Sequence, residues 1–412
     1  MPSGTRGCTG AVVFVSLAAV ALAGGQATSN EGAVRAPLAG VQEYWPTTAW
    51  RTATPSSQGM DADALGAFDA EIAAGRHGYV DGMLVVRNGF VVFERSYRHD
   101  YDALFQGKDQ RRGPYNYYDP DWHPYYQRGD LHTMQSVSKS VTSALVGIAI
   151  RGRRIPGIDA RVMPYFTGFR TPDRDRRRDA MTLRDLLTMT AGIEWDESSV
   201  PYTDPANDCA RMEQSRDWIQ YVLDQPMAEE PGSRWVYNSG ATQLLSYILK
   251  VATGREAHQF AADELFGPLG IRRYHWKTTP LGLADTEGGL YLTSRDLAKI
   301  GFLYLHDGVW DGRRILPEGW VAASVAPVVK ISDSTPRRYG FKWWLLPNGS
   351  GGYAYAANGY GGQYLIVVPE QQLIAVFTGW NIYDRPALSP QLALDRVLGA
   401  VRKPSSLAAH EP

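Results

Sequence analysis

Hydrophobic residues change their spacing along the chain, and the changes separate two strand-rich ends from a helical middle. Apolar residues repeat at helical spacing over 61–75, a segment that stops at a glycine. Two runs of β-favouring residues over 82–97 flank Asn88-Gly89, a pair that strongly favours a tight hairpin. Residues 100–130 show no period and are rich in Tyr, Pro and Asp, so we expect a long ordered loop there.

Helical spacing dominates the middle of the chain. Two of its helices start with Thr-x-x-Asp, the spacing of a helix cap, at Thr182 and Thr293. The pattern predicts helices over 136–150, 181–192, 215–224, 239–254 and 295–306. Strands then return over 339–346, 361–368 and 372–380, and a last helix starts at Ser389-Pro390.

Strands at both ends with helices between them predict an α/β (α+β) fold. In such a fold, one antiparallel sheet is built from both termini and flanked by helices, and a helical subdomain is inserted in the middle. We expect one domain over 55–405, followed by a tail at 406–412. Its sheet part takes 55–135 and 330–405, and its helical part takes 136–329.

The first residues have the order of a secretory signal. Arg6 precedes thirteen mostly apolar residues at 11–23, and the run ends in small residues. This run is short for a membrane span. We therefore predict a signal peptide at 1–23, cleaved near Ala23-Gly24, with an extended segment at 24–54 leading into a secreted or periplasmic domain. A retained membrane anchor is the alternative.

The composition of the chain limits the kinds of binding partner that we expect. The chain is 44% hydrophobic and 21% charged with a formal net charge of -1, which gives no electrostatic reason to expect nucleic acid or an anionic membrane. Signal cleavage would remove Cys8 and leave Cys209 alone, so no internal disulfide is expected. The eight histidines form no i,i+4 pair and there is no phosphate-binding glycine loop, so we expect no metal and no cofactor.

Ser136 and Lys139 are the strongest chemical signal in the chain. They stand three positions apart at the head of an apolar helix, so their side chains share a face. A serine hydroxyl is a weak nucleophile until a base takes its proton, and burial would lower the pKa of the lysine toward neutrality. The positive field of the helix N-terminus would stabilise the oxyanion. A capping serine beside a surface lysine would explain the same spacing.

Two further features favour the catalytic interpretation. Tyr237 stands just before the helix over 239–254, where its phenol could exchange protons with the serine and lysine. The strand over 356–368 is broken by glycines, which often mark a backbone that a ligand approaches closely. An aromatic packing residue and a β-bulge are the structural alternatives.

The chain resembles the serine β-lactamase and penicillin-binding protein superfamily, which shares Ser-x-x-Lys. Within it, the chain is most similar to class C β-lactamase-like esterases and to 6-aminohexanoate-oligomer hydrolases, over about residues 55 to 405. The resemblance is carried by the motifs QSVSKSVTS, MTLRDLLTMTAGI, YNSGATQLL, GGLYLTSRDLAKIG and NGYGGQ.

The resemblance implies roles for particular residues. Ser136 would be the acylated nucleophile, Lys139 its activating partner and Tyr237 a second proton shuttle. The backbone N–H groups of Ser136 and Tyr360 would form the oxyanion hole. Candidate substrate contacts are Ser239, Asn358, Gly359, Tyr202 and Asp208.

Two departures from the family pattern bear on the substrate. Ser239 stands where the family usually has asparagine, and serine reaches less far. Ala357-Asn358-Gly359 stands where the family usually has Lys- or His-Thr-Gly, so the cation that faces a β-lactam carboxylate is missing. Esters or neutral amides fit this site better than β-lactam antibiotics.

Together these features predict a secreted serine hydrolase that cleaves a small amide or ester through an acyl-enzyme on Ser136. One alternative is a non-catalytic or weakly active penicillin-binding-like protein that binds cell-wall peptides. Another is a membrane-anchored enzyme that modifies the cell wall.

Overall fold

The computed structural model describes residues 44–108, 113, 116–117, 119–124, 126–127, 130–171, 175–382 and 387–402. These residues belong to one compact unit that begins at Tyr44. The predicted signal at 1–23, most of the 24–54 segment and the 406–412 tail lie outside the described residues. No helix in the described part is long and apolar enough to cross a membrane.

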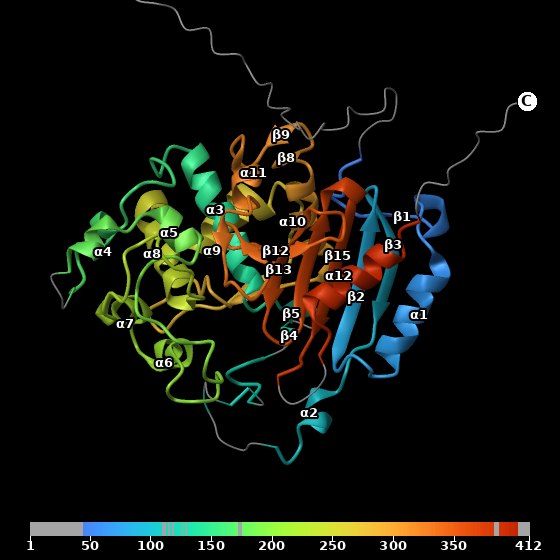
Figure 1. Cartoon of the computed structure of the whole chain (residues 1–412), viewed down its shortest axis with the longest axis horizontal. Coiled ribbons are helices and arrows are strands. Elements are labelled where there is room, and N and C mark those ends of the chain that lie inside the picture. Colours follow the sequence, from blue (N-terminus) through green and yellow to red (C-terminus); the bar gives the residue numbers. More distant parts are fainter. Residues whose placement is uncertain are drawn as a thin grey trace, which may run out of the picture. The chain divides into compact units, whose positions relative to one another are not determined.

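One large sheet joins the two ends of the chain (Figure 1), as predicted. Its nine strands run in the order β1-β3-β2-β15-β14-β13-β12-β11-β10, and every neighbouring pair is antiparallel except β1 and β3. The early strands are β1 (Arg51–Thr52), β2 (Val80–Arg87) and β3 (Phe90–Ser96). The late strands are β10 (Val329–Lys330), β11 (Arg338–Tyr339), β12 (Trp344–Pro347), β13 (Tyr353–Gly359), β14 (Gln363–Val368) and β15 (Leu373–Gly379).

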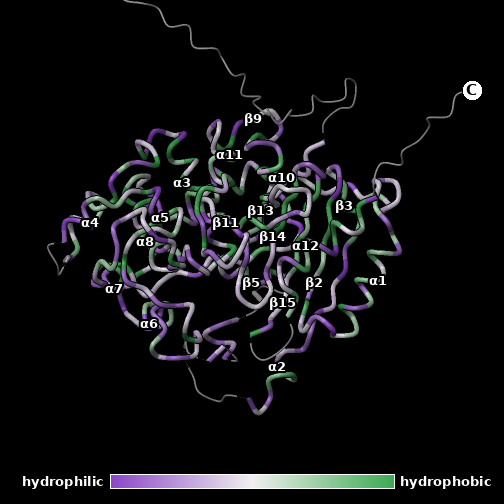
Figure 2. The backbone as a smooth tube through the Cα atoms, viewed as in Figure 1, coloured by the Kyte–Doolittle hydropathy of each residue, from purple (hydrophilic) through white to green (hydrophobic). Residues whose placement is uncertain are grey.

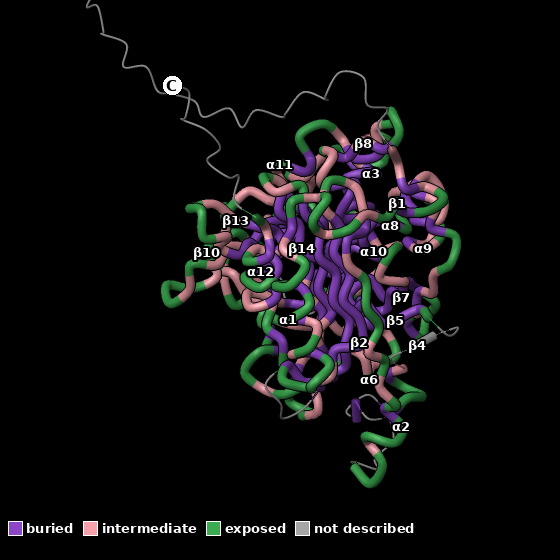
Figure 3. Tube along the Cα trace, turned by 90° about the vertical axis from the view of Figure 1, so that its right-hand side faces the viewer, coloured by how far each residue is buried: buried purple, intermediate pink, exposed green. Residues whose placement is uncertain are grey.

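Alternating side chains give the sheet two apolar faces, because successive residues of a strand point to opposite sides. In β15, Ala375 and Phe377 join the core beneath α1 (Ala62–Ala73) and α12 (Pro390–Gly399). Ile374 and Val376 join the larger core on the other face. Figure 3 shows the central strands buried along their length, and in Figure 2 polar and apolar residues alternate along α1.

The helices of the middle segment form one group, and two of them, over 137–151 and 294–305, pack on the second face of the sheet. At their centre lies α3 (Val137–Arg151), whose residues are buried from Val137 to Ala149. The others are α4 (Arg176–Ala180), α5 (Leu183–Leu187), α6 (Asp208–Gln214), α7 (Trp218–Asp224), α8 (Ser239–Thr253), α9 (Ala257–Ala261), α10 (Ser294–Leu305) and α11 (Trp320–Ser324). A short hairpin of β8 (Val309–Trp310) and β9 (Arg313–Arg314) follows α10.

A second, small sheet runs in the order β4-β5-β7-β6. Its strands are β4 (Tyr126–Gln127), β5 (Leu131–Thr133), β6 (His275–Trp276) and β7 (Leu290–Leu292). The sequence pattern did not predict this sheet, because strands of two or three residues are too short to show alternation.

The structure confirms the sequence signals for one tight turn and for the ends of two helices. The hairpin of β2 and β3 turns at Asn88 and Gly89, whose φ angles of 50° and 80° are those the turn requires. The capping box of Thr182 and Asp185 starts α5, and the left-handed Gly254 ends α8.

Four expected segments differ in the structure. The helix expected over 181–192 is only the five-residue α5. The strand expected over 339–346 is two strands, β11 and β12, separated by a turn in which Lys342 has a φ of 64°. The region over 356–368 is not one glycine-broken strand, because β13 and β14 pair antiparallel across the turn at Tyr360 to Gly362. The expected loop over 100–130 contains the short helix α2 (Tyr101–Leu104).

Candidate active site

Ser136 lies at the joint between the small sheet and α3. The Met134 N–H donates a hydrogen bond to the Leu290 carbonyl at 2.8 Å, which extends the pairing of β5 with β7. Gln135 then takes a left-handed φ of 46°, and Ser136 is the N-cap of α3. Ser136 is half-buried while the residues on both sides of the turn are buried. The fold therefore presents one hydroxyl at the head of a rigid central helix.

Lys139 is almost fully buried, with 1% of its surface exposed. Its Nζ lies 2.8 Å from Ser136 Oγ, the contact that the i,i+3 spacing predicts. The same Nζ lies 2.7 Å from the Glu287 carbonyl oxygen and 3.0 Å from Glu287 Oε2. These three acceptors match the three protons of an ammonium group.

The expected lowering of the Lys139 pKa was wrong. Burial by itself lowers that pKa, but the electrostatic interactions of the ammonium with the Tyr237 oxygen and with the Glu287 carboxylate outweigh it and raise the pKa above that of a free lysine. The helix pattern in the sequence indicated that Lys139 is buried, but it could not indicate that the Glu287 carboxylate lies beside it. Lys139 is therefore an ammonium that donates a hydrogen bond to Ser136 in the resting site.

Tyr237 stands beside the same two side chains. Its ring centre lies 5.3 Å from Lys139 Nζ, which places the phenol next to the ammonium that contacts Ser136. Burial raises the pKa of this phenol, and the Lys139 ammonium offsets only part of the increase. The structure thus brings together the three residues for which the sequence predicted catalytic roles.

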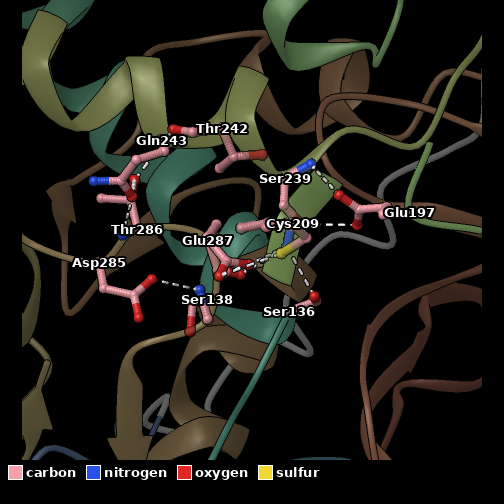
Figure 4. Close-up of polar contacts among 12 residues, drawn as sticks. Ser136, Ser138, Glu197, Cys209, Ser239, Thr242, Gln243, Asp285, Thr286 and Glu287 are labelled. Carbon is pink, nitrogen blue, oxygen red and sulfur yellow. Dashed lines mark hydrogen bonds and ion pairs between the residues drawn. The ribbon is translucent and has the colours of Figure 1, made fainter. Parts of the chain in front are cut away.

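Ser239 is directed at a buried carboxylate that the sequence analysis did not identify. Its backbone N–H and its Oγ–H donate to the two oxygens of Glu197, each at 2.8 Å (Figure 4). Trp195 Nε1 donates to Glu197 Oε2 at 2.6 Å. Burial raises the pKa of Glu197. The hydroxyl of Ser239 therefore anchors Glu197 at the start of α8.

The end of β13 lies against the turn that carries Ser136. A Cβ atom on Gly359 would come within 2.3 Å of the Met134 carbonyl oxygen, so only glycine allows this approach. The pairing of β12 with β13 ends at Trp344 and Ala356, one residue before Ala357. Asn358 Oδ1 is buried and has no hydrogen-bond partner among the described residues.

Aromatic rings gather beside this strand end. The ring centres of Tyr202 and Tyr117 lie 5.2 and 5.1 Å from that of Tyr360. The Tyr202 hydroxyl donates to Glu197 Oε1 at 3.1 Å, which links the aromatic group to the polar centre.

Asp208, the other residue of this region that was predicted to contact substrate, forms hydrogen bonds that hold the fold together. Its carboxylate accepts the Asp196 N–H at 2.7 Å and the Tyr221 hydroxyl at 3.0 Å. These bonds fasten the loop between residues 196 and 208 to α7.

Cys209, Glu213 and Glu287 bring their donor atoms within 4.8 Å of one another, a set that could ligate a metal ion. Metal ligands must be deprotonated. Burial raises the pKa values of Cys209 and Glu213 well above normal, and Glu287 is already paired with the Lys139 ammonium. The chemistry of this set favours a proton-sharing cluster around Lys139 over a metal centre.

A family model described as Beta-lactamase matches residues 66–379. The 6-aminohexanoate-dimer hydrolase of Paenarthrobacter ureafaciens is 26% identical over 277 residues, which cover 61% of this chain and 68% of that protein. A family VIII carboxylesterase has a similar structure, with a TM-score of 0.60, 15% identity and coverage of 85% of this chain and 98% of the other. The D-stereospecific amidohydrolase of Streptomyces gives a TM-score of 0.58 at 16% identity, with coverage of 82% and 98%. At these identities the two solved structures establish the fold alone.

Proposed function

The chain belongs to the beta-lactamase family and is a hydrolase of that fold, and we propose that it cleaves ester or amide bonds through an acyl-enzyme on Ser136. The observation that carries this proposal is the 2.8 Å contact between Lys139 Nζ and Ser136 Oγ at the head of α3. A buried ammonium beside a half-buried hydroxyl has no evident purpose in a protein that only binds.

Acylation begins when Ser136 Oγ attacks the substrate carbonyl carbon. The Tyr237 phenol first loses its proton to solvent, and the resulting phenolate, stabilised beside the Lys139 ammonium, accepts the hydroxyl proton of Ser136. The oxyanion accepts hydrogen bonds from the backbone N–H groups of Ser136 and Tyr360, at the positive end of α3. Collapse of the intermediate expels the alcohol or amine, which takes the proton from Tyr237.

Deacylation repeats these steps with water. A water molecule gives its proton to Tyr237 and attacks the acyl carbon, and the acid leaves as Ser136 regains its proton. Each turnover therefore consumes one water and requires no cofactor.

The surroundings favour a neutral, apolar substrate. Tyr117, Tyr202 and Tyr360 offer an aromatic wall, and Asn358 Oδ1 offers an unsatisfied acceptor for a substrate N–H or O–H. The names of similar proteins include a 6-aminohexanoate-dimer hydrolase, a D-stereospecific amidohydrolase and a carboxylesterase. We assign this chain to the same broad class of substrates.

Covalent labelling tests the proposal. The wild-type protein should react with a fluorescent phosphonate, and peptide mapping should place the label on Ser136. Ser136→Ala is the matched control and should stay unlabelled. A label on another residue, or none on wild type, would exclude the acyl-enzyme mechanism.

We also propose that the protein is exported. This rests on the residues at 11–23 and their small-residue end. N-terminal sequencing of exported protein should give a start near Gly24, and an intact Met1 on membrane-bound protein would indicate an anchor.

A further inference from the structure

Glu287 occupies most of the hydrogen-bonding capacity of the active-site lysine. Of the three acceptors around Lys139 Nζ, two belong to Glu287: its carbonyl oxygen at 2.7 Å and its Oε2 at 3.0 Å. Ser136 Oγ takes the third position at 2.8 Å. The direction of the Lys139 ammonium, and hence its contact with the nucleophile, is fixed by one residue that lies 148 positions away in the chain.

The segment that carries Glu287 is itself held firmly. The Gly288 N–H donates to Asp285 Oδ1 at 2.9 Å, and the Thr286 N–H donates to Gln243 Oε1 on α8 at 3.0 Å. Three residues later the chain enters β7, which pairs with β5 just ahead of Ser136. The nucleophile and the carboxylate are therefore positioned by the same small sheet.

A second acid lies behind the first. Glu213 on α6 is hydrogen-bonded to Glu287, and Cys209 Sγ lies 3.9 Å from Glu287 Oε1. Burial raises the pKa of Glu213 well above normal, whereas the charge of Lys139, with the Glu213 hydrogen bond, keeps the pKa of Glu287 low. Glu213 is thus the protonated donor, and Glu287 carries the single negative charge opposite Lys139.

From this geometry we propose that Glu287 is a positioning residue of the active site. It holds the Lys139 ammonium against Ser136 and sets the pH above which the serine can be activated. The inference rests on the proposed acyl-enzyme function.

The physical reason is the charge that Glu287 adds. At low pH both Tyr237 and Lys139 are protonated, so no group is available to accept the Ser136 proton, and the rate must rise as the pair loses one proton. A negative charge beside the pair opposes that loss. Replacing Glu287 with a neutral group of the same shape should move the rise to lower pH.

Several other titratable groups face Lys139 or Glu287 and contribute to the same field. They are Glu197 before α6, Cys209 and Glu213 on α6, Tyr237 before α8, Lys277 and Asp285 between β6 and β7, and Lys342 between β11 and β12. Burial and the charge of Lys139 lower the pKa of Lys342 well below normal, so it adds little charge at neutral pH. Glu287 is the carboxylate that contacts the ammonium.

The test compares the pH dependence of phosphonate labelling in wild type, Glu287→Gln, Glu287→Asp and Glu213→Gln. Labelling of wild type at Ser136 is checked first, because its absence would refute the proposed function and not the role of Glu287. Glu213→Gln is the matched control, since it replaces a neutral buried carboxyl with a neutral amide that can still donate to Glu287.

We expect the midpoint of the rise in labelling rate to fall by about one pH unit or more in Glu287→Gln, the size of effect that a neighbouring charge exerts. The midpoint for Glu213→Gln should stay within about 0.3 pH unit of the wild-type midpoint, well below that effect. An unmoved midpoint in Glu287→Gln, or an equal shift in both variants, would overturn the proposal.

Glu287→Asp keeps the charge and shortens the reach, so its midpoint should stay while its rate above the midpoint falls about tenfold, equivalent to 1.4 kcal/mol. If Glu287→Gln does not fold, this variant decides the question. Wild-type rates in Glu287→Asp would then exclude a positioning role.

Discussion

Two buried charged clusters in this protein differ in their roles: we expect one to stabilise the fold and the other to take part in the reaction. In the first, Asp81 on β2 accepts hydrogen bonds from His132 Nε2 at 3.0 Å, His99 Nδ1 at 3.1 Å and the Tyr101 hydroxyl at 2.7 Å. Burial opposes ionisation of Asp81, but His132 and His99 outweigh it and hold its pKa well below the usual range. All of this hydrogen bonding converges on one carboxylate and ties β2 to β5.

The second cluster surrounds Lys139, and it differs from the first in what its charged group contacts. The ammonium is neutralised by Glu287, yet one of its hydrogen bonds goes to a half-buried serine that has no structural need of a cation. Tyr237 is kept as a phenol by burial although an ammonium lies beside it. The Asp81 charge is paired with groups that hold two strands together, whereas the Lys139 charge contacts the residue that we propose as the nucleophile.

The largest expected effect of a substitution is that of Ser136→Ala. If the Lys139 cluster is the reactive one, removing its nucleophile should lower kcat/KM for a p-nitrophenyl ester by at least ~10⁴-fold, about 5.4 kcal/mol of barrier. The midpoint of thermal unfolding should change little. Residual activity within about tenfold of wild type would remove Ser136 from the mechanism.

Tyr237→Phe tests the proton shuttle and should have the next largest effect. The change deletes one oxygen and keeps the ring that packs 5.7 Å from the Trp344 ring. Loss of a general acid–base group typically lowers the rate by about 10²–10⁴-fold. Steady-state kcat on an ester measures it, and a variant with normal rates would leave proton transfer to Lys139 alone.

Asp81→Asn should act on stability and leave the chemistry intact. Removing one partner of a buried charge cluster costs about 3–5 kcal/mol, which urea unfolding at pH 7 would measure. The folded variant should keep kcat within about threefold, less than 1 kcal/mol of barrier. A large loss of kcat in fully folded Asp81→Asn would break the distinction between the two clusters.

The pH dependence of stability gives a further check on Asp81. A carboxyl whose pKa is lowered by folding stabilises the protein above its unfolded pKa of about 3.9, and this contribution is lost as the pH falls below that value. The free energy of unfolding of wild type should therefore decline more between pH 5 and pH 3 than that of Asp81→Asn. Parallel curves would show that Asp81 is not the titrating group.

Local signals in the sequence were enough to predict the contact between Ser136 and Lys139 and the turn at Asn88-Gly89. The contact of Ser136 with Lys139 follows from helix geometry alone, and the turn at Asn88-Gly89 follows from backbone preference. The two-ended sheet followed from the order of strand and helix patterns. These features depend on residues that are close in sequence.

What the sequence did not predict comes from distant segments. Glu287 directly precedes a motif that marked the family, yet nothing in its surroundings indicates that its carboxylate reaches Lys139. Glu197 meets Ser239 across 42 residues, and that contact changes the interpretation of Ser239. The pKa of Lys139 was predicted in the wrong direction for the same reason, because burial is visible in a helix pattern and a remote charge is not.

The smallest effect that we predict concerns substrate charge. Ala357, where relatives that bind β-lactam carboxylates place a lysine or histidine, is fully buried in the core, and Glu287 adds a negative charge near the reacting groups. A charge-assisted hydrogen bond contributes about 1.5–3 kcal/mol, so its loss should weaken use of an anionic substrate by roughly ten- to a hundredfold. Short-chain esters should therefore give a clearly higher kcat/KM than nitrocefin, with aminohexanoate-type amides between them. All three should be measured at one pH near neutral with Ser136→Ala as the blank. Nitrocefin turnover that matches the best ester would mean that another cation, Arg337 or Arg338, supplies the missing charge.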